Sequence, residues 1–237
     1  MNLNAGFFFD LERRLKDAGL DSDFETFDVI KARLASKEPL SADEFARQAF
    51  YVILAGGFSQ KAAKKIHARV MDYISNNTNP QLDDLIKIFN NKNKMSAILK
   101  IWQNRKAYRD GYYTIGKREE GKGNLLEQKL AYLSSLPHIG KITTNHLARN
   151  LGEDIVKYDI WIQRLGVAFV SQKQSIEHRA EGIDNLKSKI NNGNLDSEVK
   201  AVCDEVFEHL VRETGLPRGY IDVVLWKGLQ NHMIEGV

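Results

Sequence analysis

The sequence predicts an all-α fold. Apolar residues recur at helical spacing through most of the chain, alternating runs of β-branched residues are few, and only four prolines interrupt 237 residues. The composition, 43% hydrophobic and 27% charged, is typical of a globular protein and excludes a disordered or fibrous one. The length suits one large domain or two small ones that share a core.

Helix signals follow one another from Ser41 onwards. Ser41 and Asp43 are N-cap candidates for a first helix with an apolar face, and Gly56-Gly57 ends it. A turn-rich loop is predicted over 76–80 and a glycine-containing loop over 111–123. Further helices are predicted over about 59–74, 81–90, 93–109, 142–150, 159–169, 174–190, 198–213 and 219–233, with one more that carries Leu126, Leu130 and Leu133.

The sequence argues against several classes of protein. No apolar run approaches the ~18 residues of a membrane span, and the apolar stretch at residues 6–9 is too short for a signal peptide. We therefore expect a cytoplasmic protein. The single cysteine, Cys203, excludes an internal disulfide framework. The histidines lack zinc-site spacing, and we expect His67, His138 and His146 at the surface or in local hydrogen bonds.

The net charge of +3 conceals an uneven distribution. Residues 48–157 hold 18 basic and 9 acidic side chains, net +9, whereas residues 1–47 and 158–237 are each at −3. Such an asymmetry is typical of a face that binds a polyanion. Part of the excess comes from residues at helical spacing, namely Lys61, Lys64, Lys65 and Arg69. This cluster is either a phosphate-binding surface or an ordinary solvated helix face, because basic side chains need no phosphate partner.

The most informative segment is 133–165. Pro137 and Gly140 bracket a tight turn, residues 136–141, between two short helices. Backbone N–H groups at the start of the second helix have no partner within it, and they form an anion site that needs no side-chain charge. Lys141 opposes the helix dipole there, which is unfavourable unless an anion lies nearby. On spacing alone, an ordinary helix–turn–helix corner explains the segment equally well.

This segment resembles the helix-hairpin-helix motif of a DNA glycosylase superfamily, the one that includes endonuclease III and the alkyladenine and 8-oxoguanine glycosylases. The family pattern is leucine, proline, glycine, an apolar residue and glycine. Residues 136–140 match it, except that His138 replaces the first glycine. The family has an essential aspartate after the hairpin, and its spacing points to Asp159. Arg164 matches a common arginine, whereas Trp161 stands where a histidine is usual.

The resemblance covers residues 40–237 and implies an all-α, two-lobed fold of the HhH-GPD glycosylase type, with the cleft for DNA and base between the lobes. One lobe, a helical barrel, is expected over 44–152 and ends in the hairpin helices at about 127–151. The other lobe is expected to comprise 1–43 and 153–237 and to carry the catalytic aspartate.

The resemblance also implies a DNA N-glycosylase, which flips a damaged or modified base out of the duplex and hydrolyses its N-glycosidic bond. That bond breaks through an oxocarbenium-like sugar, which a carboxylate stabilises while it orients a water. Asp159 is the candidate, although it could equally be the N-cap of a helix that starts near Ile160. Family members that also cut the strand have a lysine where Ile142 stands. We therefore expect a monofunctional enzyme that leaves an abasic site, with the adjacent Lys141 as the alternative nucleophile.

The remaining candidate residues fall into two groups. Phe58, in the turn between the first two helices, is a candidate wedge; Tyr158, Trp161 and Trp226 are candidates for stacking on the base, and Asp222 for accepting hydrogen bonds from its edge. Core packing of the aromatics and capping of the last helix by Asp222 are the alternatives. The candidates for DNA contact are Pro137, His138, Ile139, Gly140, Lys141, Thr143, Lys61, Lys64, Lys65 and Arg164.

The single cysteine rules out the iron–sulfur cluster found in part of the family, and we expect no metal cofactor, apart from a monovalent cation that the hairpin could hold. The expected partner is double-stranded DNA with a damaged or modified base. We expect a monomer without membrane contact, associated with the nucleoid and active in base excision repair. Two alternatives stay open: excision of a modified viral base in phage defence, and a non-catalytic DNA-binding module that keeps the hairpin.

Overall fold

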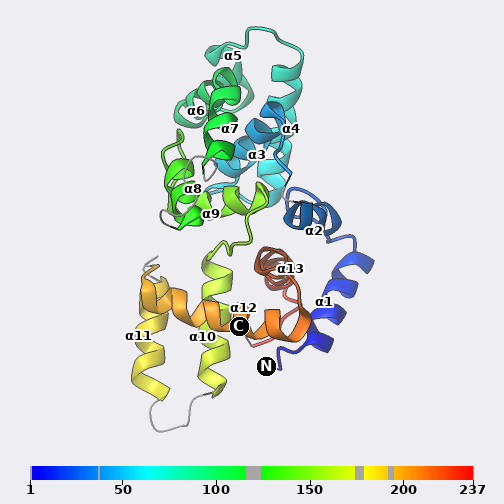
Figure 1. The fold of residues 1–237 in the computed structure, drawn as a ribbon, viewed down its shortest axis with the longest axis vertical. Helices are drawn as coiled ribbons and strands as arrows, with labels where there is room; N and C mark the ends of the chain where they lie inside the picture. Colours follow the sequence, from blue (N-terminus) through cyan, green and yellow to red (C-terminus); the bar gives the residue numbers. More distant parts are fainter. Residues whose placement is uncertain (1, 37, 116–123, 174–178, 192–194, 237) are drawn as a thin grey trace. The chain divides into compact units, whose positions relative to one another are not determined.

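The computed structural model describes residues 2–36, 38–115, 124–173, 179–191 and 195–236. Within these ranges it contains thirteen α-helices and no strand, which confirms the all-α prediction (Figure 1). The chain divides into two compact units. One consists of Met1–Leu34 and Asp154–Val237, and the other of Ala35–Glu153. None of the described helices is long and apolar enough to cross a membrane.

The unit Ala35–Glu153 is built around one central helix, α3. Almost every residue of α3 from Phe45 to Leu54 is buried, because the helix is apolar around most of its circumference and packs against α4, α6, α7 and α9. The Ser41 hydroxyl accepts the N–H of Glu44 and caps it, as predicted. The helices of this unit are α3 (Ala42–Ala55), α4 (Gln60–Ser75), α5 (Leu82–Ile88), α6 (Lys92–Gln103), α7 (Arg105–Thr114), α8 (Leu125–Ser134) and α9 (Lys141–Asn150).

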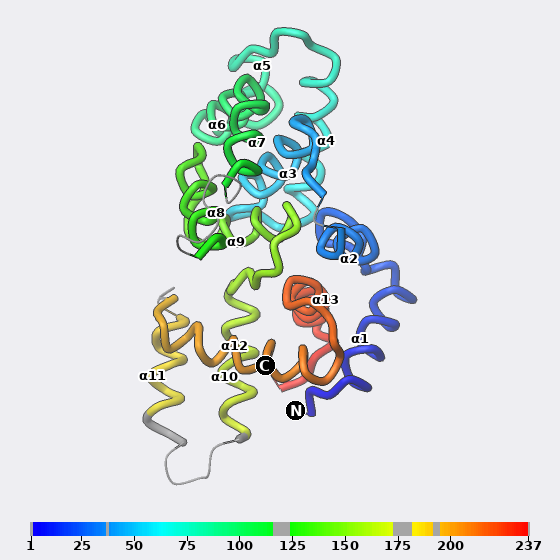
Figure 2. Tube along the Cα trace, in the orientation of Figure 1, coloured from blue at the N-terminus to red at the C-terminus, as the bar shows by residue number. Residues whose placement is uncertain are grey.

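The other unit has α10 and α13 at its centre. α10 packs against α11, α12 and α13, and α13 also packs against α1 (Figure 2). Gly166 allows α10 to lie close to α12, because a Cβ at this position would approach the backbone N and Cα of Cys203 to 3.0 Å. The helices of this unit are α1 (Ala5–Asp17), α2 (Phe27–Ser36), α10 (Ile160–Lys173), α11 (Arg179–Asn191), α12 (Ser197–Thr214) and α13 (Arg218–Gln230).

The unit boundary near the N-terminus lies earlier than the predicted lobe boundary at 43/44. The connection after α2 belongs with α7 because the Leu40 N–H donates to the Tyr113 hydroxyl at 3.1 Å, and Arg109 Nε donates to the Leu40 carbonyl at 2.8 Å. These two hydrogen bonds tie residues 38–41 to the unit Ala35–Glu153. At the second boundary, the structure divides the chain after Glu153, next to the predicted 152/153.

Three predicted segments differ from the structure. The predicted helix over 93–109 is two helices, because Asn104 turns its side chain back to the Lys100 carbonyl and ends α6. Part of the predicted loop over 111–123 is helical up to Thr114, and residues 116–123 lie outside the described residues. Residues 174–178 of the predicted helix over 174–190 also lie outside them, and the helix is described from Arg179.

Candidate functional site

The hairpin between α8 and α9 adopts a tight turn held by two buried apolar residues. Leu136 and Ile139 are almost fully buried, and the Ile139 N–H donates to the Leu136 carbonyl at 3.2 Å. Between them, His138 has φ +62° and an exposed side chain. This left-handed backbone conformation favours glycine, and His138 occupies the position where the family pattern has glycine. The backbone at His138 therefore has a conformation that glycine adopts more readily than any other residue.

Replacement of His138 by glycine should stabilise the protein. A residue with a Cβ pays about 1 kcal/mol for the left-handed conformation, which glycine adopts freely. We expect His138→Gly to raise the free energy of unfolding by about 1 kcal/mol in urea denaturation. His138→Ala is the matched control, because it removes the imidazole but keeps the Cβ, and it should bring no gain. Equal stability of the Gly and Ala variants would contradict the strained backbone at this position.

The start of α9 is capped by its own threonines. The Thr143 hydroxyl accepts the Gly140 N–H at 2.7 Å and donates to the Gly140 carbonyl, which also accepts the N–H and hydroxyl of Thr144. The Gly140 amide, expected to be available to an anion, is therefore occupied, and Thr143 serves as a cap. Helix geometry still leaves the N–H groups of Lys141 and Ile142 without an acceptor within α9. Both of these side chains are exposed.

Asp159 is the N-cap of α10, as the sequence predicted for its structural role. Its Oδ1 accepts the N–H groups of Trp161 and Ile162 at 3.1 and 3.3 Å, and its carbonyl accepts the N–H of Gln163. Its Oδ2 lies 3.3 Å from Nζ of Lys157. The Asp159 and Lys157 side chains are each 15% exposed. Two N–H donors and one ammonium thus fix the direction of a carboxylate that remains accessible to solvent.

Lys157, which the sequence did not single out, connects Asp159 to two other candidates. Its Nζ lies 4.7 Å from the centre of the Trp226 ring, and its backbone N–H donates to Asp222 Oδ2 at 3.4 Å. Residues 153–159 have no regular secondary structure, and Val156 and Tyr158 are buried while Lys157 and Asp159 are only partly so. One sequence signal could have found Lys157. It lies two residues before Asp159, and extended backbone places side chains at that spacing on the same side.

Two other candidates have structural roles. Tyr158 is buried, and its hydroxyl donates to Asp204 at 2.5 Å, so we do not retain it as a residue that stacks on a base. Burial and this hydrogen bond raise the pKa of Tyr158. Asp222 is fully buried in the second turn of α13, and the N-cap of that helix is Pro217, so the predicted capping role of Asp222 is wrong.

The two tryptophans that are candidates for stacking on a base, Trp161 and Trp226, differ in exposure. Trp226 is 7% exposed, with the ammonium groups of Lys157 and Lys227 at 4.7 and 5.7 Å from the ring centre. Trp161 is only partly buried and packs against the core of its unit, where its ring meets that of His232 edge to face at 6.3 Å. Both therefore contribute to packing, and Trp161 keeps part of its surface available.

Phe58 projects from the turn between α3 and α4 and is 43% exposed. Gly57 has φ +79°, which lets the chain reverse direction within two residues of the end of α3. The Phe58 ring packs edge to face on Phe89 at 5.3 Å. A Cβ on Gly56 would lie 3.8 Å from the Thr143 methyl group, so this turn lies beside the start of α9. The candidate wedge is thus at the surface and close to the hairpin.

The basic side chains of the unit Ala35–Glu153 are of two kinds. Some have structural partners: Arg105 pairs with Asp43 and lies over Trp102, and Lys129 pairs with Glu153. Others, Lys61, Lys65 and Arg69, lie exposed at helical spacing on α4 and make no ion pair with a described residue. Lys64 between them is half-buried. The α4 cluster, formed by Lys61, Lys65 and Arg69, is therefore an exposed basic surface that an anion can reach, whereas Arg105 and Lys129 are held by structural partners.

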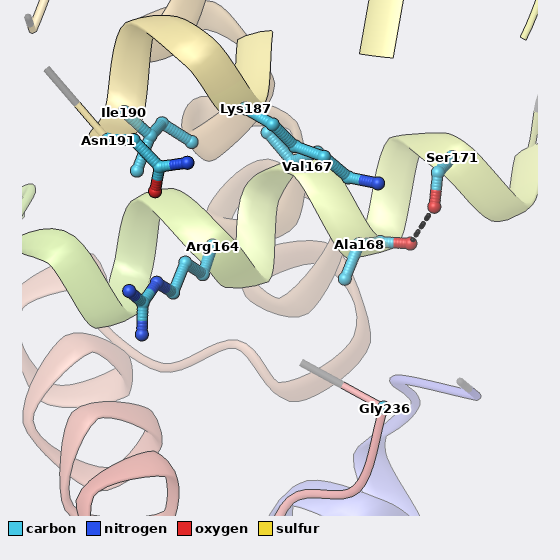
Figure 3. Close-up of a pocket in the computed structure, with 8 residues that line it drawn as sticks. All are labelled: Arg164, Val167, Ala168, Ser171, Lys187, Ile190, Asn191 and Gly236. Carbon is cyan, nitrogen blue, oxygen red and sulfur yellow. Dashed lines mark hydrogen bonds between the residues drawn. The ribbon is translucent and has the colours of Figure 1, made fainter. Parts of the chain in front are cut away.

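Arg164 lines a cavity of about 350 Å³ between α10, α11 and the chain's last residues (Figure 3). Val167 and Ile190 form an apolar wall, and Lys187 adds a second cation. The Arg164 guanidinium also lies 5.7 Å from the centre of the Trp161 ring. Residues 192–194 and 237, which adjoin two of the lining residues in the chain, lie outside the described ranges.

The histidines form no metal site in the part of the chain that the structure describes. No group of three or more His, Cys, Asp or Glu side chains there could hold a metal ion. His138 is exposed, as expected, but His67 and His146 are buried, and their rings each meet the Tyr51 ring edge to face, with centroids 6.1 and 5.8 Å apart. Surface positions for these two are therefore wrong, because their faces of α4 and α9 pack against α3. The expected alternative of a hydrogen bond is present at His67, whose Nε2 lies 3.1 Å from the Arg47 carbonyl oxygen.

Comparison with known proteins adds no relative. No protein-family model, no curated protein and no solved structure matches the chain.

Proposed function

We propose that the protein is a monofunctional DNA N-glycosylase. The observation that carries the proposal is the Asp159 carboxylate, which is accessible and held by two backbone N–H groups and Lys157. It follows, at the family's spacing, a hairpin whose His138 has the backbone conformation of the motif's glycine. A fixed, charged carboxylate is what the cleavage of an N-glycosidic bond needs, because positive charge develops on the sugar.

The charge distribution supports DNA as the partner. The unit Ala35–Glu153 has 19 basic and 11 acidic side chains, net +8, whereas the other unit has 15 basic and 20 acidic ones, net −5. The hairpin and the α4 cluster thus belong to the basic unit. In the proposed reaction, these groups hold the phosphate backbone. Asp159 then stabilises the oxocarbenium-like sugar of a flipped nucleotide and directs a water to its C1′.

A panel of duplexes, each with one altered base, tests this proposal. The panel includes oxidised guanine, alkylated purines, deaminated bases and a bulky glycosylated pyrimidine, incubated with saturating protein and then cleaved with alkali at any abasic site. We expect an alkali-dependent product on at least one duplex and no complex trapped by borohydride. Binding without product on any duplex would contradict the glycosylase and favour the non-catalytic module. A trapped complex would contradict the monofunctional subtype, and the Lys141→Gln variant would then identify its nucleophile.

Salt should weaken the complex with any duplex, and the α4 cluster should account for part of that effect. Each phosphate contact adds about 0.9 to the slope of log affinity against log salt, so loss of one contact lowers the slope by about 1. We expect Lys65→Gln to do this equally on modified and unmodified duplexes, measured by fluorescence anisotropy. Lys87→Gln is the control, because Lys87 is exposed but paired with Asp84 at 2.7 Å. An unchanged slope for Lys65→Gln would place the DNA elsewhere.

A further inference from the structure

Lys94 is a buried lysine in the first turn of α6 that the proposed reaction does not use. Its side chain is almost fully buried, and it makes no ion pair with a carboxylate of the described residues. Instead, Nζ donates to the carbonyl of Gly56 at 2.5 Å and approaches that of Leu54 at 3.4 Å. Burial lowers the pKa of Lys94. Burying an ammonium raises the free energy of the folded state unless hydrogen bonds compensate for the lost hydration, so the groups around Lys94 have to provide them.

The carbonyl groups at the end of α3 explain why the charge is tolerated. The last carbonyls of a helix lack intrahelical donors and carry the negative end of its dipole, which favours a cation. α3 ends at Ala55, and Leu54 and Gly56 flank that end. Lys94 therefore acts as a C-terminal cap for α3 that is supplied by a different helix.

The same ammonium also contacts the side chain that follows the turn. Nζ of Lys94 lies 4.7 Å from the centre of the Phe58 ring, within the range of a cation–π interaction. The Phe58 N–H donates to the Ala55 carbonyl at 3.2 Å. Lys94 thus holds the turn 56–58 from both sides, through a backbone carbonyl before Gly57 and through the aromatic ring after it.

We propose that Lys94 is a positioning residue that fixes Phe58 as the wedge inserted into the DNA duplex, an inference that rests on the proposed function. A wedge has to replace stacking interactions worth a few kcal/mol. An exposed phenylalanine beside two glycines would lose part of its effect to the cost of ordering the turn. Lys94 removes that cost because the turn is already ordered in the free protein.

The test is a duplex with a tetrahydrofuran abasic analogue opposite 2-aminopurine, whose fluorescence rises when the base loses its stacking. Saturating protein removes differences in affinity from the comparison. We expect Phe58→Ala and Lys94→Met each to reduce the rise roughly fivefold. The double variant should be no worse than Phe58→Ala, because Lys94 acts through Phe58. Lys92→Met, an exposed lysine on the same helix, should behave as wild type.

A second measurement follows the turn itself in the free protein. Lys94→Met should increase amide hydrogen exchange at Phe58 at least fivefold, and the fold should persist because methionine replaces a buried charge with an apolar chain of similar length. If Lys94→Met shows the same fluorescence rise as wild type, or if the losses in the double variant are additive, the role of Lys94 is overturned but the wedge role of Phe58 is not. Binding by the wild type without any rise would overturn the wedge, and with it the role of Lys94, whereas the excision panel tests the glycosylase independently.

Discussion

Asp159→Asn should abolish base excision while the protein remains folded and bound to DNA. Asparagine is as good an N-cap as aspartate, so its side-chain oxygen can still accept the N–H groups of Trp161 and Ile162. The substitution removes only the negative charge, which is the property that stabilises an oxocarbenium-like sugar. We expect the single-turnover rate of excision to fall by about 10³-fold. Loss of the pair with Lys157 should cost about 1 kcal/mol of stability.

The chain contains a close structural match for Asp159 that serves as the control. Asp196 caps α12, its Oδ1 accepts two backbone N–H groups at 3.1 and 3.0 Å, and its Oδ2 pairs with Lys189 at 2.9 Å. Asp196→Asn should therefore reduce stability by a similar amount but leave the rate of excision within about twofold of wild type. Equal rates for wild type and Asp159→Asn would show that Asp159 is a cap and nothing more.

The pair of aspartates also shows what the sequence can and cannot settle about the site. A polar residue before an apolar helix predicts a cap at Asp159, and the structure confirms it. The contact with Lys157 depends on the extended backbone before α10, which leaves no periodic signal. Asp222 lies 65 residues beyond Lys157 in the chain, so only the tertiary structure brings its carboxylate to the Lys157 N–H.

The same limit applies to the basic segment. The excess of basic residues can be counted in the sequence. The structure shows, however, that Arg105 is hydrogen-bonded to Asp43, 62 residues away, and Lys94 to the carbonyl of Gly56, 38 residues away. Counting charges cannot separate such side chains from those available to phosphate. Lys61, Lys65 and Arg69 were recognisable because their spacing places them together on the outer face of one helix.

The fold was predictable where helices have one apolar face and clear ends. α1 escaped prediction, although Asn4 caps it and Phe8, Leu11 and Leu15 form its buried stripe. The boundary between α6 and α7 could not be predicted, because the sequence is helical on both sides of Asn104 and a single asparagine is a weak stop signal. Periodicity thus predicts that a segment is helical more securely than it predicts the first and last residues of the helix.

Acid should destabilise the protein through His67. This residue is 5% exposed between α4 and α3, and its Nε2 lies 3.1 Å from the Arg47 carbonyl. Burial, which outweighs the Arg47 carbonyl, lowers the pKa of His67 to about 4. In the unfolded chain a histidine titrates near 6.5, so between these two values the unfolded state binds more protons than the folded state. Stability is complete above pH 6.5 and falls by about 3 kcal/mol as the pH decreases to 4.

Urea denaturation at pH 7 and pH 4 measures this loss in wild type and in His67→Gln, which cannot take up a proton. The difference between the two proteins isolates His67, because their other titrating groups are the same. We expect wild type to lose about 3 kcal/mol more than the variant. Glu44 favours the protonated form of His67 and Arg47 opposes it, and the pKa of about 4 includes both effects. His138→Gln is the control, since His138 is exposed, and it should lose as much as wild type. Equal losses for wild type and His67→Gln would mean that the buried imidazole accepts a proton without cost to the packing of α3 against α4.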